Sequence, residues 1–283
     1  MIRNYAPTRF GQMHYGAAGD PKKPAIILLP QAGRTSTMYR ALAAKLCDEY
    51  RVYAIDYLGT GTSDPLPSGA RIEDLADAAA DFMDHLDVGS AYLYGHHAGN
   101  KVGAALAAGR PERIRKFVFA GQSHSIVPSN AHRSKTTATT RMKLLGPSDE
   151  RETALVQWAD LFSFVSTTWW RETLTRNIAD SAVRAETIIK VVDELQAASG
   201  IPDFYRAIRS YDMERDLRRI TVPTMILEIA TPHEDQWVGR QGAALLATIS
   251  GSVLTTVEEK DFHGITLEDK PDQLSGILKS FFR

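Results

Sequence analysis

The sequence predicts an α/β protein with a mostly parallel central sheet, helices on both faces of the sheet and an inserted helical cap. Short apolar runs alternate along the chain with amphipathic patterns of helical period, as expected of strand–helix units. The clearest runs contain no charged residue, which is typical of parallel strands covered by helices on both faces. A long stretch that lacks such runs interrupts the alternation, and this interruption predicts the insertion.

Six strands are expected from these runs. Four of them lie in the first half of the chain, and each ends in a polar or glycine-containing turn. The other two follow the interruption, so we expect the insertion to divide a single sheet and not to separate two domains. The expected strands are residues 25–29, 52–55, 91–94, 117–120, 224–227 and 253–257.

Two covering helices are indicated by apolar side chains at helical spacing. The first spans residues 75–86, and Gly89 supplies a stop signal. The second spans residues 274–281 at the C-terminus, where Pro271 suits a first helical turn. Both helices are expected to pack on the sheet.

Residues 122–217 lack a clear strand pattern and are rich in polar helix formers and aromatic residues. We interpret this stretch as a helical cap, and residues 1–121 together with 218–283 as the α/β core. Aromatic side chains in the cap, such as Trp158, favour an apolar or aromatic substrate if they line a pocket. The alternative is that they form the core of the cap itself.

Composition favours a small, roughly neutral partner. The 283 residues carry a formal net charge of -1 without a run of like charges, so a nucleic-acid partner is not expected. The single cysteine, Cys47, cannot form an intrachain disulfide, which fits a reducing compartment. No segment approaches the roughly 20 apolar residues that span a bilayer, and the N-terminus has no signal-peptide pattern. We therefore expect a cytoplasmic protein with a small-molecule substrate and no membrane partner.

The expected strand at residues 91–94 runs directly into the sequence G-H-H-A-G at positions 95–99, and a helical pattern follows. Glycines on both sides of the central residue, His97, let its backbone adopt a strained conformation that larger neighbours would forbid. Such a turn lifts the central side chain above the sheet. Gly99 and Gly103 would also let the following helix approach the sheet closely.

This turn resembles the nucleophile elbow G-x-S-x-G of the α/β-hydrolase family, with His97 in place of the serine. L-L-P-Q-A-G at 28–33 is similar to the oxyanion-hole loop of the family, and D-Y-L-G-T-G-T-S at 56–63 to its D-x-x-G-x-G-x-S turn. V-P-T at 222–224 resembles the start of the strand that precedes the catalytic acid in the family. D-F-H-G at 261–264 resembles the loop that carries the catalytic histidine of the family. The resemblance covers nearly the whole chain outside the cap.

The resemblance implies catalytic roles for several residues. His97 stands at the position of the nucleophile, and His263 at that of the base. The implied acid is Asp235 or Glu234, which could orient the ring of His263, although the usual Gly-x-x-Asp spacing is missing. Glu228 at a strand end is a weaker candidate. For all three carboxylates the alternative is an ordinary solvated loop residue.

The same resemblance implies an oxyanion hole formed by the backbone N–H groups of Ala32 and Ala98. Because backbone amides form it, the hole does not depend on the side chain at the elbow. Gln31 could add an amide donor near the bound carbonyl, and the alternative is a surface side chain.

We infer a hydrolase that cleaves an ester, lactone or other activated carbonyl of a small, apolar molecule without a cofactor. The imidazole of His97 or His263 would remove a proton from water, and in a variant His97 attacks the carbonyl directly. Two other hypotheses stay open: a cofactor-free lyase, isomerase or oxygenase with a histidine base, and a ligand-binding protein without catalysis. No metal is expected, because the chain has no close-spaced ligand pair such as H-x-x-x-H.

Overall fold

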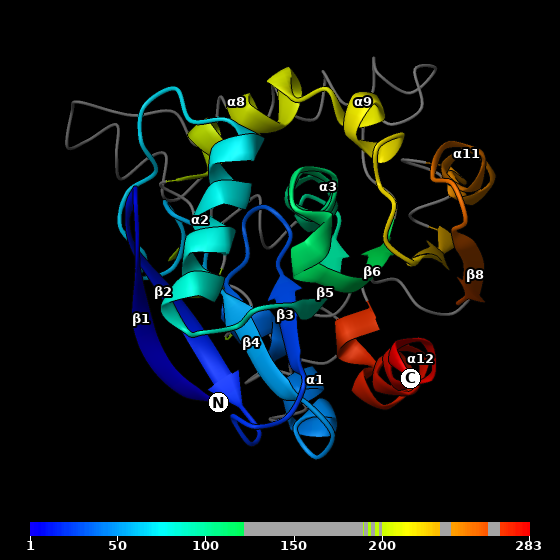
Figure 1. The fold of residues 1–283 in the computed structure, drawn as a ribbon, viewed down its shortest axis with the longest axis horizontal. Helices are drawn as coiled ribbons and strands as arrows, with labels where there is room; N and C mark the ends of the chain where they lie inside the picture. Colours follow the sequence, from blue (N-terminus) through cyan, green and yellow to red (C-terminus); the bar gives the residue numbers. More distant parts are fainter. Residues whose placement is uncertain (122–188, 190–191, 194–195, 198–199, 233–238, 260–266) are drawn as a thin grey trace, which may run out of the picture.

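The computed structural model describes residues 1–121, 189, 192–193, 196–197, 200–232, 239–259 and 267–283. Their framework is an eight-stranded sheet in the order β1-β2-β4-β3-β5-β6-β7-β8 (Figure 1). β1 runs antiparallel to β2, and β2 antiparallel to β4, whereas every other neighbouring pair is parallel. The strands are β1 (Ile2–Thr8), β2 (Gly11–Ala18), β3 (Ala25–Leu29), β4 (Arg51–Ile55), β5 (Ala91–His96), β6 (Ile114–Ala120), β7 (Thr224–Ala230) and β8 (Val253–Glu258).

This sheet confirms the predicted fold class, an α/β protein with a mostly parallel sheet. All six expected strands are present, as β3 to β8, and their boundaries differ from the prediction by at most three residues. The sequence does not predict the hairpin of β1 and β2. β1 forms an edge of the sheet and is mostly exposed, so it has no apolar run that would reveal it.

Helices cover both faces of the sheet, and each layer encloses its own apolar core. On the face covered by α2 and α3, Phe82 of α2 and Phe117 of β6 are completely buried. On the other face, Leu42 of α1 and Leu278 of α12 are completely buried. None of the helices among the described residues combines the length and the apolar character that crossing a bilayer requires. The elements are α1 (Arg40–Leu46), α2 (Ile72–His85), α3 (Gly99–Gly109), α12 (Pro271–Phe282) and the 3-10 turns η1 (Ser36–Tyr39), η2 (Pro111–Arg113) and η5 (Leu267–Asp269).

The two predicted covering helices are present as α2 and α12. α2 begins at the buried Ile72, before the predicted start at residue 75, and Asp74 caps it: the carboxylate accepts a hydrogen bond from the backbone N–H of Arg71 at 2.8 Å. It ends before Gly89, the predicted stop. Asp87 adopts the left-handed conformation there, with a φ of 53°, so an aspartate serves where the sequence indicates a glycine.

The chain leaves the sheet after β6 and returns at β7, and these two strands are direct parallel neighbours. Most of the predicted cap, residues 122–217, lies outside the described residues, so its assignment as a cap stays a prediction. Its described end contains α8 (Ile201–Ser210) and α9 (Met213–Leu217). α9 contacts α3. Figure 1 shows both helices at the top, on the side to which the arrow of β3 points.

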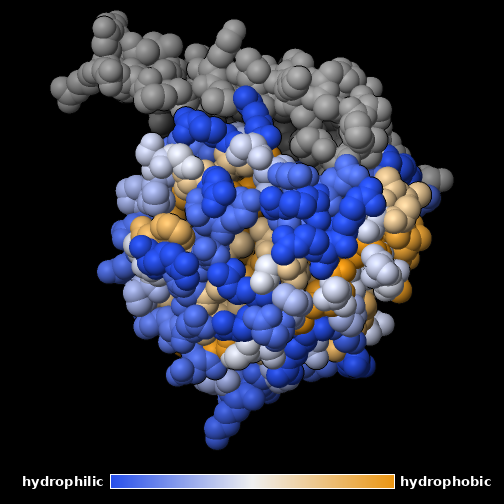
Figure 2. All heavy atoms as spheres, turned by 45° about the horizontal axis from the view of Figure 1, so that its top comes forward, coloured by the Kyte–Doolittle hydropathy of each residue, from blue (hydrophilic) through white to orange (hydrophobic). Residues whose placement is uncertain are grey.

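The edge of the sheet at β8 is only partly covered. Val253 and Leu254 of β8 are exposed, as is Leu246 of α11 (Gly242–Thr248). Figure 2 shows apolar surface at the right, where Figure 1 places α11 and β8. This half-covered position explains why β8 mixes polar and apolar residues, in contrast to the central strands.

Gly99→Ala is expected to destabilise the protein, because α3 begins against the backbone of β3. A Cβ at position 99 would lie 2.3 Å from the carbonyl oxygen of Leu29 and 3.0 Å from that of Pro30. The free energy of unfolding, measured by urea denaturation, should fall by about 1–3 kcal/mol. Gly109→Ala is the matched control, since nothing lies within 4 Å of a Cβ there. That variant should be neutral or more stable by up to about 1 kcal/mol, and equal losses in the two variants would contradict the close approach.

Candidate active site

His97 occupies the turn between β5, which ends at His96, and α3, which begins at Gly99. Its φ of 48° is a left-handed conformation that residues other than glycine rarely adopt. Hydrogen bonds hold the turn on both sides. The His97 N–H donates to the Ala120 oxygen at 3.2 Å, and the His97 oxygen accepts the Asn100 N–H at 3.1 Å. His97 therefore stands in a strained strand-to-helix turn at the carboxyl end of β5.

Glycines make this conformation possible. A Cβ on Gly95 would lie 2.8 Å from the oxygen of Gly99, so the two ends of the turn are nearly in contact. A Cβ on Gly121, which follows β6, would lie 2.7 Å from Cδ2 and 2.9 Å from Nε2 of His97. The imidazole therefore packs directly on the backbone at the end of β6.

The ring of His97 also stacks on the ring of His96, with centroids 4.2 Å apart and planes at 25°. His96 is completely buried, whereas His97 is partly exposed. The ring of His97 thus contacts both its neighbour in the chain, His96, and the backbone at the end of β6. Four other predicted site residues lie outside the described residues: His263, Asp235, Glu234 and Trp158.

The segments that carry Ala32 and Ala98 lie next to each other at the carboxyl ends of β3 and β5. These strands are parallel neighbours, and the Leu29 oxygen lies against the start of α3. Ala32 and Ala98 are each 8% exposed. Ala98 forms the N-cap of α3, where the helix dipole favours negative charge. This placement is compatible with an oxyanion hole, a role that stays a proposal.

Gln31 is buried in the same loop, with 8% of its surface exposed. This burial does not fit the alternative of a surface side chain. Among the described residues, no group forms a hydrogen bond with its buried Oε1 atom. A buried amide oxygen without a partner is unfavourable, so Gln31 is a candidate for contact with a ligand.

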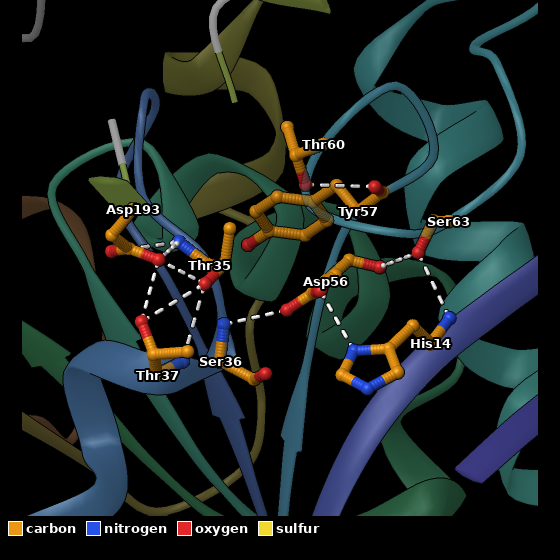
Figure 3. A network of polar contacts seen from close by, with 9 residues as sticks. All are labelled: His14, Thr35, Ser36, Thr37, Asp56, Tyr57, Thr60, Ser63 and Asp193. Atoms are coloured by element: carbon orange, nitrogen blue, oxygen red, sulfur yellow. Dashed lines mark hydrogen bonds and ion pairs between the residues drawn. The ribbon is translucent and has the colours of Figure 1, made fainter. Parts of the chain in front are cut away.

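A buried carboxylate after β4 supports the loop that follows β3. Asp56 Oδ1 accepts the Ser36 N–H at 2.6 Å, and Oδ2 lies 2.8 Å from His14 Nδ1 (Figure 3). The Ser63 hydroxyl donates to the Asp56 backbone oxygen at 2.9 Å and accepts the His14 N–H at 2.9 Å. The D-x-x-G-x-G-x-S segment therefore holds the β3 loop in place. The sequence gives no sign of the role of His14, because His14 lies far along the chain from the D-x-x-G-x-G-x-S segment that it contacts.

A second carboxylate reaches the same loop from the insertion. Asp193 is 1% exposed, and its Oδ2 lies 2.5 Å from the Arg34 Nε. It also accepts hydrogen bonds from the Thr35 N–H at 3.2 Å and from the hydroxyls of Thr35 and Thr37 (Figure 3). No motif marks Asp193, which is 158 residues from Thr35, so the sequence gives no signal for this contact.

Glu228, the weaker candidate for the acid, is engaged in supporting α11. It is 8% exposed in β7 and accepts the N–H groups of Gln241 at 3.1 Å and Gly242 at 2.7 Å. The hydroxyl of Thr256 donates to its other oxygen at 3.2 Å. These bonds favour a structural role for Glu228.

Lys101 is a buried cation near the start of α3. It is 3% exposed, and its Nζ lies 3.3 Å from the Met213 Sδ of α9. Burial lowers the pKa of its ammonium group from 10.5 to about 8. A lysine in a helix usually faces solvent, so the sequence gives no sign of this burial. Lys101 links the helix that follows His97 to the inserted segment.

Two completely buried tyrosines beside the β3 loop differ in their partners. The Tyr39 hydroxyl donates to the Leu29 oxygen at 2.8 Å. The Tyr57 hydroxyl has no hydrogen-bond partner among the described residues, and its ring packs on Phe204 of α8 with centroids 5.1 Å apart. Burial raises the pKa of both hydroxyls well above the usual value, so both are neutral.

Comparisons with known proteins agree on the architecture. Residues 24–154 match the family described as "alpha/beta hydrolase fold". The protein named "Putative carbamate hydrolase RutD" from Stutzerimonas stutzeri is 28% identical over 222 residues, which cover 76% of this chain and 77% of that protein. The 3-oxoadipate enol-lactonase 2 of Acinetobacter baylyi is 22% identical over 215 residues, which cover 76% of this chain and 74% of that protein.

Solved structures are similar over nearly the whole chain. A hydrolase from Pseudomonas aeruginosa PA01 has a TM-score of 0.73 at 23% identity, with 99% of this chain and 97% of that chain covered. The enol-lactonase from Burkholderia xenovorans LB400 has a TM-score of 0.72 at 21% identity, with 98% and 99% covered. At these identities the likeness concerns the arrangement of the sheet and its helices.

Tyr57→Phe is expected to stabilise the protein, because it removes a buried hydroxyl that has no partner among the described residues. The free energy of unfolding from urea denaturation should rise by about 1–2 kcal/mol. Tyr39→Phe is the matched control: it removes a buried hydroxyl that is bonded to Leu29, so the same quantity should fall by about 1 kcal/mol. A loss of stability in both variants would show that the Tyr57 hydroxyl has a partner in solution.

Lys101→Met is expected to stabilise the protein at pH 7 and to lose this advantage as the pH rises. In wild type the pKa of the Lys101 ammonium group is about 8 in the folded state, and its ordinary value is 10.5. Between about pH 8 and 10.5 the unfolded chain therefore binds more protons than the folded chain. The free energy of unfolding of wild type should therefore rise relative to that of the variant from about pH 8 to 10.5. Urea denaturation across this range measures the difference, with Lys22→Met as the matched control for removing an exposed lysine. A constant difference between wild type and Lys101→Met would contradict the burial of a charged lysine.

Proposed function

This chain has the α/β-hydrolase fold, and from that premise we propose that it hydrolyses an ester, lactone or other activated carbonyl of a small molecule. The observation that carries the proposal is the left-handed turn at His97, which places this partly exposed residue at the carboxyl ends of the parallel strands, with its Nε2 atom buried. Ligands of open α/β sheets bind at this end. The names of two relatives, a carbamate hydrolase and an enol-lactonase, support a carbonyl as the reacting group.

In the proposed reaction His97 acts as a general base. Its neutral imidazole takes a proton from a water molecule, and the water oxygen attacks the carbonyl carbon. The N–H groups of Ala32 and Ala98 stabilise the negative charge that develops on the carbonyl oxygen. When the tetrahedral intermediate collapses, the leaving oxygen takes the proton from the imidazolium, so the base is regenerated without an acyl-enzyme.

The residues outside the described part of the chain complete the proposal. His263 would be the second imidazole of the pair and would relay the proton, while Asp235 or Glu234 would fix its tautomer. Trp158 would contact the substrate through its apolar ring. Within the described part of the chain, Gln31 would contact it through its buried amide. No step requires a metal or an organic cofactor.

A base beside an oxyanion hole could also abstract a proton from a substrate carbon, which is the chemistry of a cofactor-free lyase or isomerase. The observation that favours this second candidate is that a histidine occupies the elbow, where it can serve as a base without a nucleophilic serine. The origin of the product oxygen separates the two reactions. In water enriched in ¹⁸O, hydrolysis puts the label into the product acid, and isomerisation does not.

His97→Ala should abolish hydrolysis if His97 is the base. We expect kcat/KM for a panel of chromogenic esters and lactones to fall by at least about 100-fold for every substrate that wild type cleaves. His85→Ala is the control, because His85 is exposed at the end of α2 and should retain wild-type activity. Circular dichroism of both variants checks that the fold is intact.

Two results would contradict the proposal. If wild type cleaves none of the esters and lactones, the reaction class is excluded. Alternatively, wild-type rates in a folded His97→Ala variant would exclude His97 as the base and leave the reaction to other groups.

A further inference from the structure

The loop that follows β3 is held between two buried carboxylates that come from different parts of the chain (Figure 3). Asp193 of the inserted segment accepts the Thr35 N–H, and Asp56, at the end of β4, accepts the Ser36 N–H at 2.6 Å. These two amides are consecutive in the chain. Asp56 is itself fixed by His14 of β2, so this support belongs to the core. The other support comes from the inserted segment.

Asp193 is bound tightly by the loop. Its carboxylate lies 2.5 Å from both the Arg34 Nε and the Thr37 Oγ1, and it also accepts the Thr35 hydroxyl. The side chains of Arg34 and Asp193 are 7% and 1% exposed, so the pair is removed from water. Charge-assisted hydrogen bonds of this kind are short and directional. They therefore fix where residues 34–37 lie.

Residues 34–37 are connected through a tight turn to Ala32, whose N–H belongs to the proposed oxyanion hole. The Arg34 N–H donates to the Gln31 oxygen at 3.3 Å, which closes a tight turn around Ala32. On its other side this turn continues from Pro30, whose oxygen lies against Gly99 at the start of α3. A shift of Arg34 would therefore move the Ala32 N–H relative to the fixed end of α3.

A buried ion pair adds little net stability compared with an apolar pair of the same size, because both charges lose their water. It does constrain geometry, because a carboxylate surrounded by donors on one loop has few alternative arrangements. The pair of Arg34 and Asp193 is therefore better suited to holding the loop than to raising the stability of the fold.

We propose that Asp193 is a positioning residue through which the inserted segment sets the Ala32 amide of the oxyanion hole. The inference rests on the proposed function, because positioning of the Ala32 amide matters only if that amide stabilises an oxyanion during hydrolysis. It makes transition-state stabilisation depend on a contact from the insertion, whereas the described contacts of His97 come from β5, β6 and α3 of the core.

Asp193→Asn tests this role, since the amide keeps an acceptor for the threonines and removes the charge that pairs with Arg34. Asp203→Asn is the control: Asp203 lies in the same insertion, on α8, and its ion pair with Arg206 is half exposed. Both variants are assayed with the best ester or lactone substrate, at a temperature where circular dichroism shows each to be folded. A stable phosphonate that mimics the tetrahedral intermediate is the inhibitor.

The expected result for Asp193→Asn is a fall in kcat/KM of at least about tenfold, with KM changed less than about twofold. The Ki of the phosphonate should rise by the same factor as kcat/KM falls, because both report binding of the oxyanion. Asp203→Asn should match wild type in all three quantities. A merely structural role would not raise Ki in proportion to the loss of kcat/KM.

Amide hydrogen exchange gives a readout that does not require activity. In Asp193→Asn the amides of residues 32–37 should exchange faster than in wild type, and those of α3 should be unchanged. Unchanged exchange in residues 32–37, or unchanged kcat/KM and Ki in a variant whose loop exchanges faster, would overturn the inference. If wild type cleaves no substrate, the proposed function itself fails, and the exchange experiment alone decides whether Asp193 positions the loop.

Discussion

The close contact between the end of β3 and the start of α3 is the constraint on which the rest of the site depends. Gly99 lies so near the Leu29 oxygen that no side chain fits at this position. This contact sets where α3 begins, and α3 in turn requires that the chain reverse within the two residues after β5. His97 absorbs the reversal with its positive φ. The strain at His97 is thus the local result of packing a helix directly on the backbone of a neighbouring strand.

The same contact places the loop after β3 beside the turn at His97. The loop is not held by its own apolar residues alone, because Gln31, Arg34 and Thr35 are buried in it. Buried polar groups need partners, and two carboxylates provide them, Asp56 from the core and Asp193 from the insertion. The described contacts of the His97 backbone thus come from the core, and the insertion contributes a partner for Arg34, Thr35 and Thr37, which follow Ala32. A site assembled in this way is complete only when both parts of the chain are in place.

The parts of this structure that the sequence predicts are those with a local signal. β3 and β5 are covered on both faces, so their runs of apolar residues reveal them, whereas exposed β1 has no such run. The glycines around His97 indicate the turn because a close backbone approach permits no other residue. The contacts of Asp193 and His14 arise from tertiary folding between distant segments, and a carboxylate or an imidazole in isolation carries no sign of its partner. Lys101 shows the same limit, since a tertiary contact, the packing of α9 on α3, lies over this helical lysine.

The direction of the His97 ring bears on how a histidine could work at this turn. β5 lies between β3 and β6 in the sheet, and the ring leans toward β6, where it packs on Gly121. The stack on His96 holds it there. The proposed oxyanion amide of Ala32 lies on the opposite side, after β3. The proposed reaction needs the ring only as a general base for a water molecule, a role that does not require the imidazole to contact the carbonyl carbon, as a nucleophile must.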